Sequence, residues 1–189
     1  MKLIAFGDSL VAGFGLPQEE GFVPQLEAWL NENGAGPVTV TNAGVSGDTT
    51  SGGLARLDWA VTPDADAVLL ELGANDMLRG VDPAIAKDNL DQMIARLKAR
   101  GVPVLLASMP SLGNWGEDYK RDFEALYPAL AEKHETPLLA FLGDVAGEEN
   151  LNQPDGIHPN KRGVAVMVER LGPQIRDFVN DARAEKADG

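Results

Sequence analysis

The sequence of 189 residues predicts a three-layer α/β/α fold built on a five-stranded parallel sheet. Short apolar runs, rich in the residues that favour buried strands, alternate with segments whose apolar residues recur at helical spacing. Strand alternating with helix is typical of a parallel sheet whose right-handed crossovers place helices on both faces. The five expected strands are Leu3 to Phe6, Val38 to Thr41, Ala67 to Leu72, Val102 to Ala107 and Leu138 to Phe141.

Four longer segments have the pattern of amphipathic helices that would cover such a sheet. Large apolar side chains follow helical spacing within residues 22–30, 85–97, 123–130 and 164–175. Pro is favoured in the first helical turn, so the last of these helices is expected to begin at Pro159. We expect one domain over residues 1–180 and a polar C-terminal tail over residues 181–189, where the last helix frays.

Composition excludes several classes of partner. The formal net charge of −13 repels polyanions, so no nucleic-acid partner is expected. No stretch approaches the ~20 apolar residues of a membrane helix, and no integral membrane segment is expected. The chain has no Cys, which excludes disulfides, thiol catalysis and cysteine metal sites. The sequence does not indicate an oligomeric state.

The start of the chain does not have the pattern of a secretory leader. A leader needs a basic start followed by about 7 to 15 apolar residues, and here Gly7 and Asp8 interrupt the apolar run after four. The expected location is therefore the cytoplasm, or the periplasm or the exterior if a leader has been removed.

The glycine pattern excludes the common nucleotide-binding motifs. The segment Gly13-Phe14-Gly15 lacks the third glycine of a dinucleotide fingerprint, and no G-x-x-x-x-G-K-[ST] motif occurs. The acidic segment 144–152 lacks the ligand spacing of a calcium loop. We therefore expect neither a cofactor nor a metal ion.

Polar residues that could take part in catalysis follow the expected strands. Ser9 comes directly after the first strand, in Gly7-Asp8-Ser9-Leu10, at the sheet edge where open α/β folds bind ligands. It does not lie in a G-x-S-x-G elbow, because Val11 stands where the second glycine belongs. Ser9 is either a nucleophile or the cap of the next helix, since Ser is a favoured cap.

Two further turns end at the same edge. Gly44 follows the second strand and could direct its N–H at a bound oxygen, although Gly44 and Gly47 could equally serve only to relieve a tight turn. Asp48 or Thr49 would then cap the next helix. Asn75 follows the third strand and could donate its amide to a developing oxyanion, or it could be a structural turn residue.

The fifth strand leads to Asp155-Gly156-Ile157-His158-Pro159. Three residues of separation across a turn lets the Asp155 carboxylate reach the His158 imidazole and fix the tautomer whose other nitrogen accepts a proton. The alternative is a turn-forming Asp and a helix-capping His. The only other histidine, His134, ends a helical segment, where a cation complements the helix dipole.

Taken together, these four blocks resemble the SGNH, or GDSL, hydrolase family, in which Ser, Gly, Asn and His occur in that order. Gly7-Asp8-Ser9-Leu10, Gly44, Gly73-x-Asn75-Asp76 and Asp155-x-x-His158 carry the likeness, which runs through nearly the whole chain. It is strongest to the thioesterase I, lysophospholipase L1 and arylesterase branch. The resemblance implies a flavodoxin-like strand order of 2-1-3-4-5.

The resemblance also implies a mechanism. Ser9 would be the nucleophile, His158 the general base and then acid, and Asp155 the residue that orients it. The Ser9 N–H, the Gly44 N–H and the Asn75 amide would form the oxyanion hole. The expected activity is hydrolysis of small carboxylic esters, aryl or short-to-medium acyl, and of thioesters.

The substrate pocket and two alternative functions remain open at this stage. Candidates for the pocket are the apolar residues near the motifs, Leu10, Leu112, Trp115 and Ile157. A carbohydrate O-acetyl esterase would use the same catalytic residues. A non-catalytic flavodoxin-like domain that binds a phosphate at helix N-termini is the alternative of another class.

Overall fold

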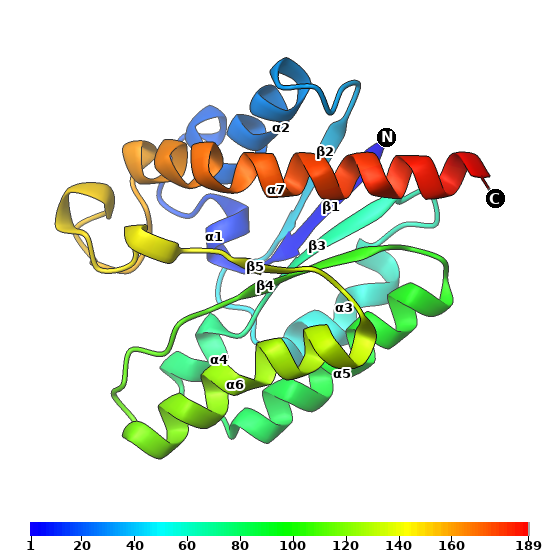
Figure 1. The fold of residues 1–189 in the computed structure, drawn as a ribbon. Coiled ribbons are helices and arrows are strands. Elements are labelled where there is room, and N and C mark those ends of the chain that lie inside the picture. The colour runs from blue at the N-terminus through cyan, green and yellow to red at the C-terminus, as the bar shows by residue number, and fades with distance from the viewer. Residues whose placement is uncertain (189) are drawn as a thin grey trace.

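The computed structural model describes residues 1–188 and confirms the five-stranded parallel sheet, with strand order β2-β1-β3-β4-β5 (Figure 1). The strands are β1 (Lys2–Gly7), β2 (Thr39–Gly44), β3 (Ala67–Glu71), β4 (Val104–Ser108) and β5 (Leu138–Ala140). The α-helices are α1 (Ser9–Ala12), α2 (Phe22–Glu32), α3 (Thr50–Ala60), α4 (Ala74–Leu78), α5 (Pro83–Ala99), α6 (Glu117–His134) and α7 (Lys161–Asp188). Three short 3-10 helices complete the fold: η1 (Gln18–Glu20), η2 (Gly143–Val145) and η3 (Glu149–Leu151).

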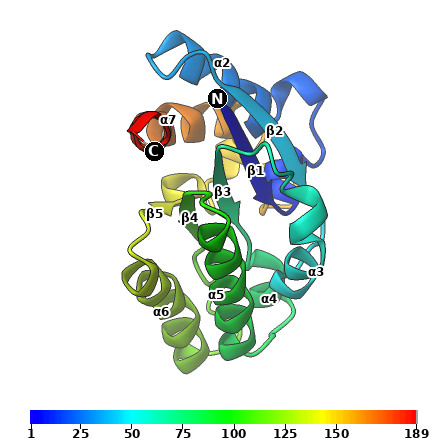
Figure 2. The same ribbon diagram turned by 90° about the vertical axis from the view of Figure 1, so that its right-hand side faces the viewer.

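Helices cover both faces of the sheet, as the alternation of strands and helices predicts. Helices α2 and α7 pack together on one face, and α3, α5 and α6 lie on the other (Figure 2). Because both faces are covered, the inner strands β1 and β4 are buried over most of their length, and β3 is buried throughout. Its sequence AVLLE ends in Glu71, a buried carboxyl in an otherwise apolar strand.

Helix α7 begins two residues later than the sequence predicts. Pro159 forms an isolated antiparallel bridge with Asn152 and stays outside the helix. The cap is Asn160, whose Oδ1 accepts a hydrogen bond from the Gly163 N–H at 3.0 Å. Asn is among the best helix caps, so the cap at Asn160 decides where the helix begins.

The end of α7 also differs from the predicted tail. The helix continues through Asp188, Ala182 is buried, and Arg183 donates to the backbone carbonyl oxygens of Ala35, Gly36 and Pro37. The tail expected from residue 181 is therefore packed over at least its first residues. These contacts hold the end of α7 beside the start of the sheet, so both ends of the described chain lie at that edge (Figure 1).

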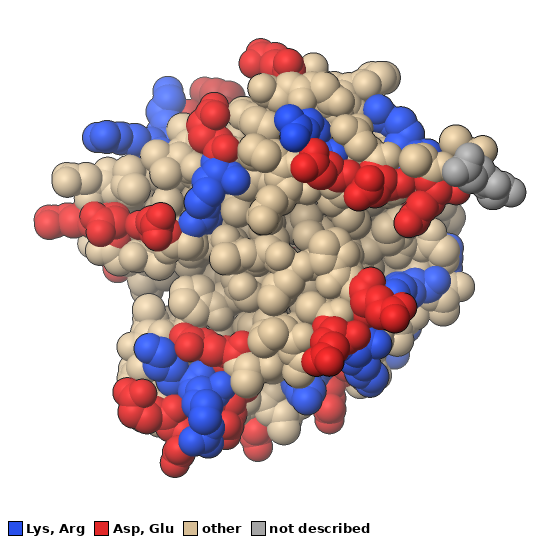
Figure 3. Space-filling view, in the orientation of Figure 1, with Lys and Arg blue, Asp and Glu red and all other residues tan. Residues whose placement is uncertain are grey.

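The charged side chains lie mainly on the helices. On the face seen in Figure 3, acidic and basic side chains are interspersed around an uncharged band between α7 and α6, over the edge strand β5. Among the helices of residues 1–188, none combines the length and the apolar character that a bilayer crossing requires.

Candidate active site

Three side chains from distant parts of the chain form a hydrogen-bonded row at the carboxyl edge of the sheet. Ser9 is the first residue of α1, directly after β1, and its Oγ lies 2.8 Å from Nε2 of His158. The Nδ1 of the same ring lies 2.6 Å from Oδ2 of Asp155. With the proton on Nδ1 directed at the carboxylate, Nε2 is free to accept the Ser9 hydroxyl proton.

The loop before α7 fixes this imidazole. Oδ1 of Asp155 accepts from the backbone N–H groups of Ile157 and His158, which closes the turn on itself. Partial burial acts to raise the pKa of the Asp155 carboxyl, but these hydrogen bonds and the nearby imidazole outweigh it and lower the pKa to about 2. Asp155 is thus a carboxylate at neutral pH, as an orienting residue requires.

Asn75 also reaches the site, from a short helix and not from the strand-to-loop turn that the sequence predicts. It lies in the first turn of α4, and its Nδ2 donates to the Asp48 carbonyl at 2.9 Å and to Oδ2 of Asp8 at 3.1 Å. Asp8 in turn caps α1 through the Leu10 N–H. The Asn75 amide is therefore held beside the residue that precedes Ser9.

Gly44 does not have the orientation that an oxyanion donor needs. The Val45 N–H donates to the Gly7 carbonyl in β1, and successive N–H groups of a strand point to opposite sides. The Gly44 N–H therefore points away from β1, and it donates to Oδ1 of Asn42 at 2.9 Å. A Cβ at Gly44 would lie 2.3 Å from the Ala12 nitrogen, so this glycine allows α1 to pack closely across β2.

A cavity of about 150 Å³ opens beside Ser9 and His158. Its walls are mostly apolar, and three of the predicted pocket residues, Leu10, Leu112 and Ile157, line it. Trp115 does not line it: the ring packs against Gly80, and its Nε1 donates to the Met77 carbonyl at 2.8 Å. The remaining apolar walls come from Ala74, Met77, Leu78, Met109, Pro110, Leu142 and Ala146.

Residues 5–166 match the GDSL-like lipase/acylhydrolase family. The chain belongs to this family. It is 41% identical over 178 residues to an arylesterase of Vibrio mimicus, covering 92% of this chain and 88% of the relative. It is 35% identical over 180 residues to thioesterase 1/protease 1/lysophospholipase L1 of Escherichia coli K12, covering 94% and 85%. The crystal structure of TesA superposes with a TM-score of 0.85 at 37% identity, covering 92% of this chain and 97% of that one.

Membership of the GDSL-like family makes the protein a serine hydrolase of carboxylic esters, and the fold agrees with its solved relatives. The sequence alone did not find two groups that surround the GDSL serine. Phe14 lies against the His158 ring, with centroids 4.7 Å apart, and half of its surface is exposed. Its position in Gly13-Phe14-Gly15, close after the GDSL serine, is the only signal that the sequence offers.

The second group is a pair of buried carboxyls beneath the GDSL serine. Asp8 and Glu71 are both fully buried, and Oε2 of Glu71 accepts from the Asp8 N–H at 3.1 Å. Burial raises the pKa of Asp8 to about 6. Burial, joined by the charge of Asp8, raises the pKa of Glu71 well above its usual range. The sequence does contain a signal for this buried carboxyl, because a Glu ends the apolar run that forms β3.

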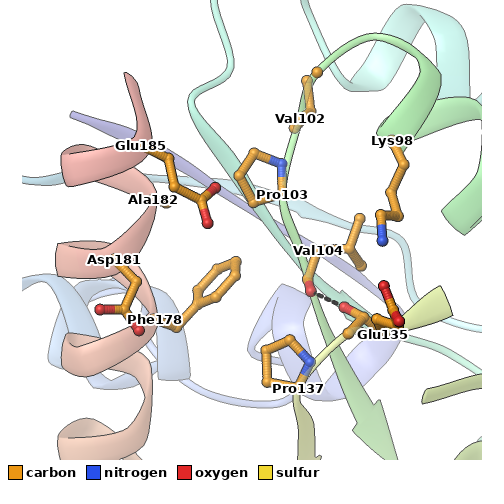
Figure 4. Close-up of a pocket in the computed structure, with 12 residues that line it drawn as sticks. Lys98, Val102, Pro103, Val104, Glu135, Pro137, Phe178, Asp181, Ala182 and Glu185 are labelled. Carbon is orange, nitrogen blue, oxygen red and sulfur yellow. Dashed lines mark hydrogen bonds between the residues drawn. The ribbon is translucent and has the colours of Figure 1, made fainter. Parts of the chain in front are cut away.

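A larger cleft of about 360 Å³ lies at the opposite edge of the sheet, between α7 and the segments 101–104 and 135–137 (Figure 4). Phe178 and the carboxylates of Glu135, Asp181 and Glu185 lie around it. It holds no part of the Ser9–His158–Asp155 row. The larger cleft and the Ser9–His158–Asp155 row therefore lie in different parts of the molecule.

Proposed function

We propose that Ser9 is the nucleophile of this esterase and that it forms an acyl-enzyme. The observation that carries the proposal is the unbroken row from the Ser9 hydroxyl through His158 to Asp155. Ser9 Oγ attacks the acyl carbon while Nε2 of His158 takes the hydroxyl proton. The bond to the leaving oxygen or sulfur then breaks, and His158 gives its proton to that alcohol or thiol.

The second half of the reaction uses the same residues. Water attacks the acyl carbon and gives a proton to Nε2 of His158. The ester bond to Ser9 breaks, the carboxylic acid leaves, and Ser9 recovers the proton from His158. Asp155 remains a carboxylate in both halves and stabilises the imidazolium that forms.

The oxyanion would be held by three N–H donors. The Ser9 N–H lies at the start of α1, where helix N–H groups lack partners within the helix. The Asn75 amide would exchange its longer bond, to Asp8, for the substrate oxygen. For the third donor we propose Gly47 in place of Gly44.

Gly47 suits this role by its backbone and its neighbours. It has φ +86° as the third residue of the turn closed by the Asp48 N–H and the Val45 carbonyl, the position at which a type II turn requires glycine. Within residues 1–188 no group accepts from the Gly47 N–H. The next residue, Asp48, is the one whose carbonyl binds Asn75.

The proposed substrates are esters, and thioesters, with short-to-medium acyl groups. The support is the apolar cavity of about 150 Å³ beside Ser9, which would take the acyl group, together with relatives named as an arylesterase and a thioesterase. The acyl chain would lie along Leu10, Leu112 and Ile157.

The test is kcat/KM for p-nitrophenyl esters from acetyl to dodecanoyl, with Ser9→Ala as the blank. We expect an optimum at short-to-medium acyl groups, a fall at dodecanoyl, and only background rates for Ser9→Ala. A sharp preference for acetyl would favour a carbohydrate deacetylase instead. If Ser9→Ala equalled the parent at every length, the nucleophile would lie elsewhere.

A further inference from the structure

The buried guanidinium of Arg56 binds three backbone segments that meet at the proposed oxyanion hole. From α3, its Nη2 donates to the Gly7 carbonyl at 2.9 Å and its Nη1 to the Ala43 carbonyl at 2.8 Å. Its Nε donates to Oδ2 of Asp48 at 2.6 Å. One planar group therefore joins the end of β1, the end of β2 and the turn that follows β2.

The surroundings of Arg56 leave it little freedom. Its side chain is only 8% exposed, and the guanidinium carbon lies 4.0 Å from the centroid of the Phe6 ring. A buried charge is tolerated only when its partners are in place, and Asp48 supplies the opposite charge. The fork geometry of the guanidinium fixes the directions of its hydrogen bonds, which a Lys ammonium does not.

Each segment bound by Arg56 leads directly to a proposed oxyanion donor. Gly7, whose carbonyl accepts from Arg56, lies two residues before Ser9 in the sequence. The other two acceptors belong to Ala43, four residues before Gly47, and to Asp48, the residue after it. The third donor, Asn75, is tied to the same Asp48 through its carbonyl at 2.9 Å. We propose that Arg56 is a positioning residue that sets the relative placement of the three donors without touching the substrate.

This inference rests on the proposed function of Ser9 and goes beyond it to a residue outside the Ser, Gly, Asn and His blocks. Its physical basis is that oxyanion stabilisation depends on donors held in place before the reaction. A shift of one donor by about 1 Å lowers turnover strongly while the ground-state complex changes little. Loss of the Arg56 guanidinium should therefore reduce kcat more than it changes KM.

Arg183 provides a matched control for the simple alternative, in which Arg56 serves only stability. It also donates to three groups, here the backbone carbonyls of Ala35, Gly36 and Pro37, but at the opposite edge of the sheet. Replacing either arginine by Lys removes a guanidinium that joins backbone segments. Only the Arg56 change should affect the chemistry.

The experiment compares Arg56→Lys with Arg183→Lys, using p-nitrophenyl butanoate and protein shown to be folded by its thermal melt. For Arg56→Lys we expect kcat to fall about 10- to 100-fold with KM within about threefold. For Arg183→Lys we expect a lower Tm and kcat within about twofold of the parent. A folded Arg56→Lys with the parental kcat would overturn the proposal.

A double-mutant cycle with Asn75→Ala gives a readout that a stability role would not move. If Arg56 acts through the donors, its effect on kcat should shrink when Asn75 is already gone, because residues of one hydrogen-bond network, here linked through Asp48, are not additive. Effects that multiply fully would contradict the proposal. If Arg56→Lys does not fold, Asp48→Asn replaces it in the same cycle, because this change removes the partner charge and keeps the backbone carbonyl of residue 48. We expect a smaller loss of kcat with the same non-additivity. Effects on kcat that multiply fully would again overturn the proposal.

The Ser9→Ala blank separates this inference from the proposed function. If Ser9→Ala is inactive while the Arg56 variants keep the parental kcat, only the positioning role fails. If Ser9→Ala is active, the proposed nucleophile fails, whatever the Arg56 variants do.

Discussion

The two histidines of this chain form similar pairs with aspartate in very different surroundings. His158 and His134 each lie 2.6 Å from a carboxylate oxygen, of Asp155 and Asp91 respectively, and both imidazoles are largely buried. The Asp91 carboxylate also binds Lys133 at 2.7 Å, whereas the other ring nitrogen of His158 meets the Ser9 hydroxyl. A His–Asp pair is therefore common to both regions, and the third partner, a hydroxyl in one and an ammonium in the other, distinguishes them.

The largest difference between the pairs should be in turnover. His158→Ala removes the proposed general base, and we expect kcat to fall on the order of 10⁴-fold or more. His134→Ala should leave kcat within about twofold and lower Tm, because it removes only a contact between α6 and α5. Both values follow from one p-nitrophenyl ester assay and one thermal melt, and equal losses of kcat in the two variants would refute the distinction.

The next effect comes from the oxyanion donors, which the His134 region lacks. Asn75→Ala should lower kcat on the order of 10²-fold with normal folding, since removing one such donor has about this effect in comparable sites. Asn89→Ala is the control, because Asn89 donates to the Thr50 and Ser51 hydroxyls and to none of the proposed oxyanion donors or the Ser9–His158–Asp155 row. Near-parental turnover by a folded Asn75→Ala would show that the assigned role is wrong.

The two regions also differ in the pKa values of their carboxyl groups, and this difference should make stability depend on pH. The pKa of Asp91 and that of Asp155 are lowered, whereas the pKa of Glu71, beneath Ser9, is raised well above its ordinary value of 4.5. A raised acid pKa means that the folded state keeps a proton which the unfolded state loses, so stability falls as pH rises from 4.5 through the folded-state value. Glu71→Gln mimics the protonated form and cannot ionise.

We therefore expect the Tm of Glu71→Gln minus that of the parent to increase from pH 5 to pH 9. Each kcal/mol of difference corresponds to roughly 2–4 °C for a chain of this size. Exposed Glu32→Gln should show no such trend. A difference that is flat with pH would mean that Glu71 does not retain its proton in the folded state.

The smallest expected effect belongs to the aromatic ring on His158. Phe14→Leu should lower kcat about two- to fivefold, since an aromatic contact contributes about 0.5–1.5 kcal/mol and part of it is replaced by the Leu side chain. Phe14→Tyr keeps the ring and should stay near the parent. If Phe14→Leu and Phe14→Tyr have equal kcat, the ring contact does not support the imidazole.

The sequence predicted the parts of this site that depend on chain order. Each of the four polar residues Ser9, Asn75, Asp155 and His158 follows a predicted strand. Because the carboxyl ends of parallel strands meet at one edge of the sheet, the sequence alone predicts that these residues lie close together. The strand order agreed as well. Shorter-range details, such as the start of α7, depend on which of two nearby residues, His158 or Asn160, caps the helix.

The parts that could not be predicted depend on direction and burial. Gly44 and Gly47 lie three residues apart, and only the pairing of β2 with β1 determines that the Gly44 N–H points outward. From the sequence alone, Arg56 is expected to be a polar residue on the surface of a helix. In the structure it is buried against the ends of β1 and β2. Trp115 is exposed and near the motifs, yet its indole is held by the Met77 carbonyl outside the cavity.

The position of the chain ends has a practical consequence for use of the enzyme on a support. Met1 is bound to the Pro37 carbonyl and Arg183 to the same loop, so both ends of the described chain lie at the edge of the sheet opposite Ser9. Attachment to a bead or electrode through either end would present the face that carries Ser9 to the bulk solution. Immobilised particles should thus keep open access for substrate whichever end is anchored.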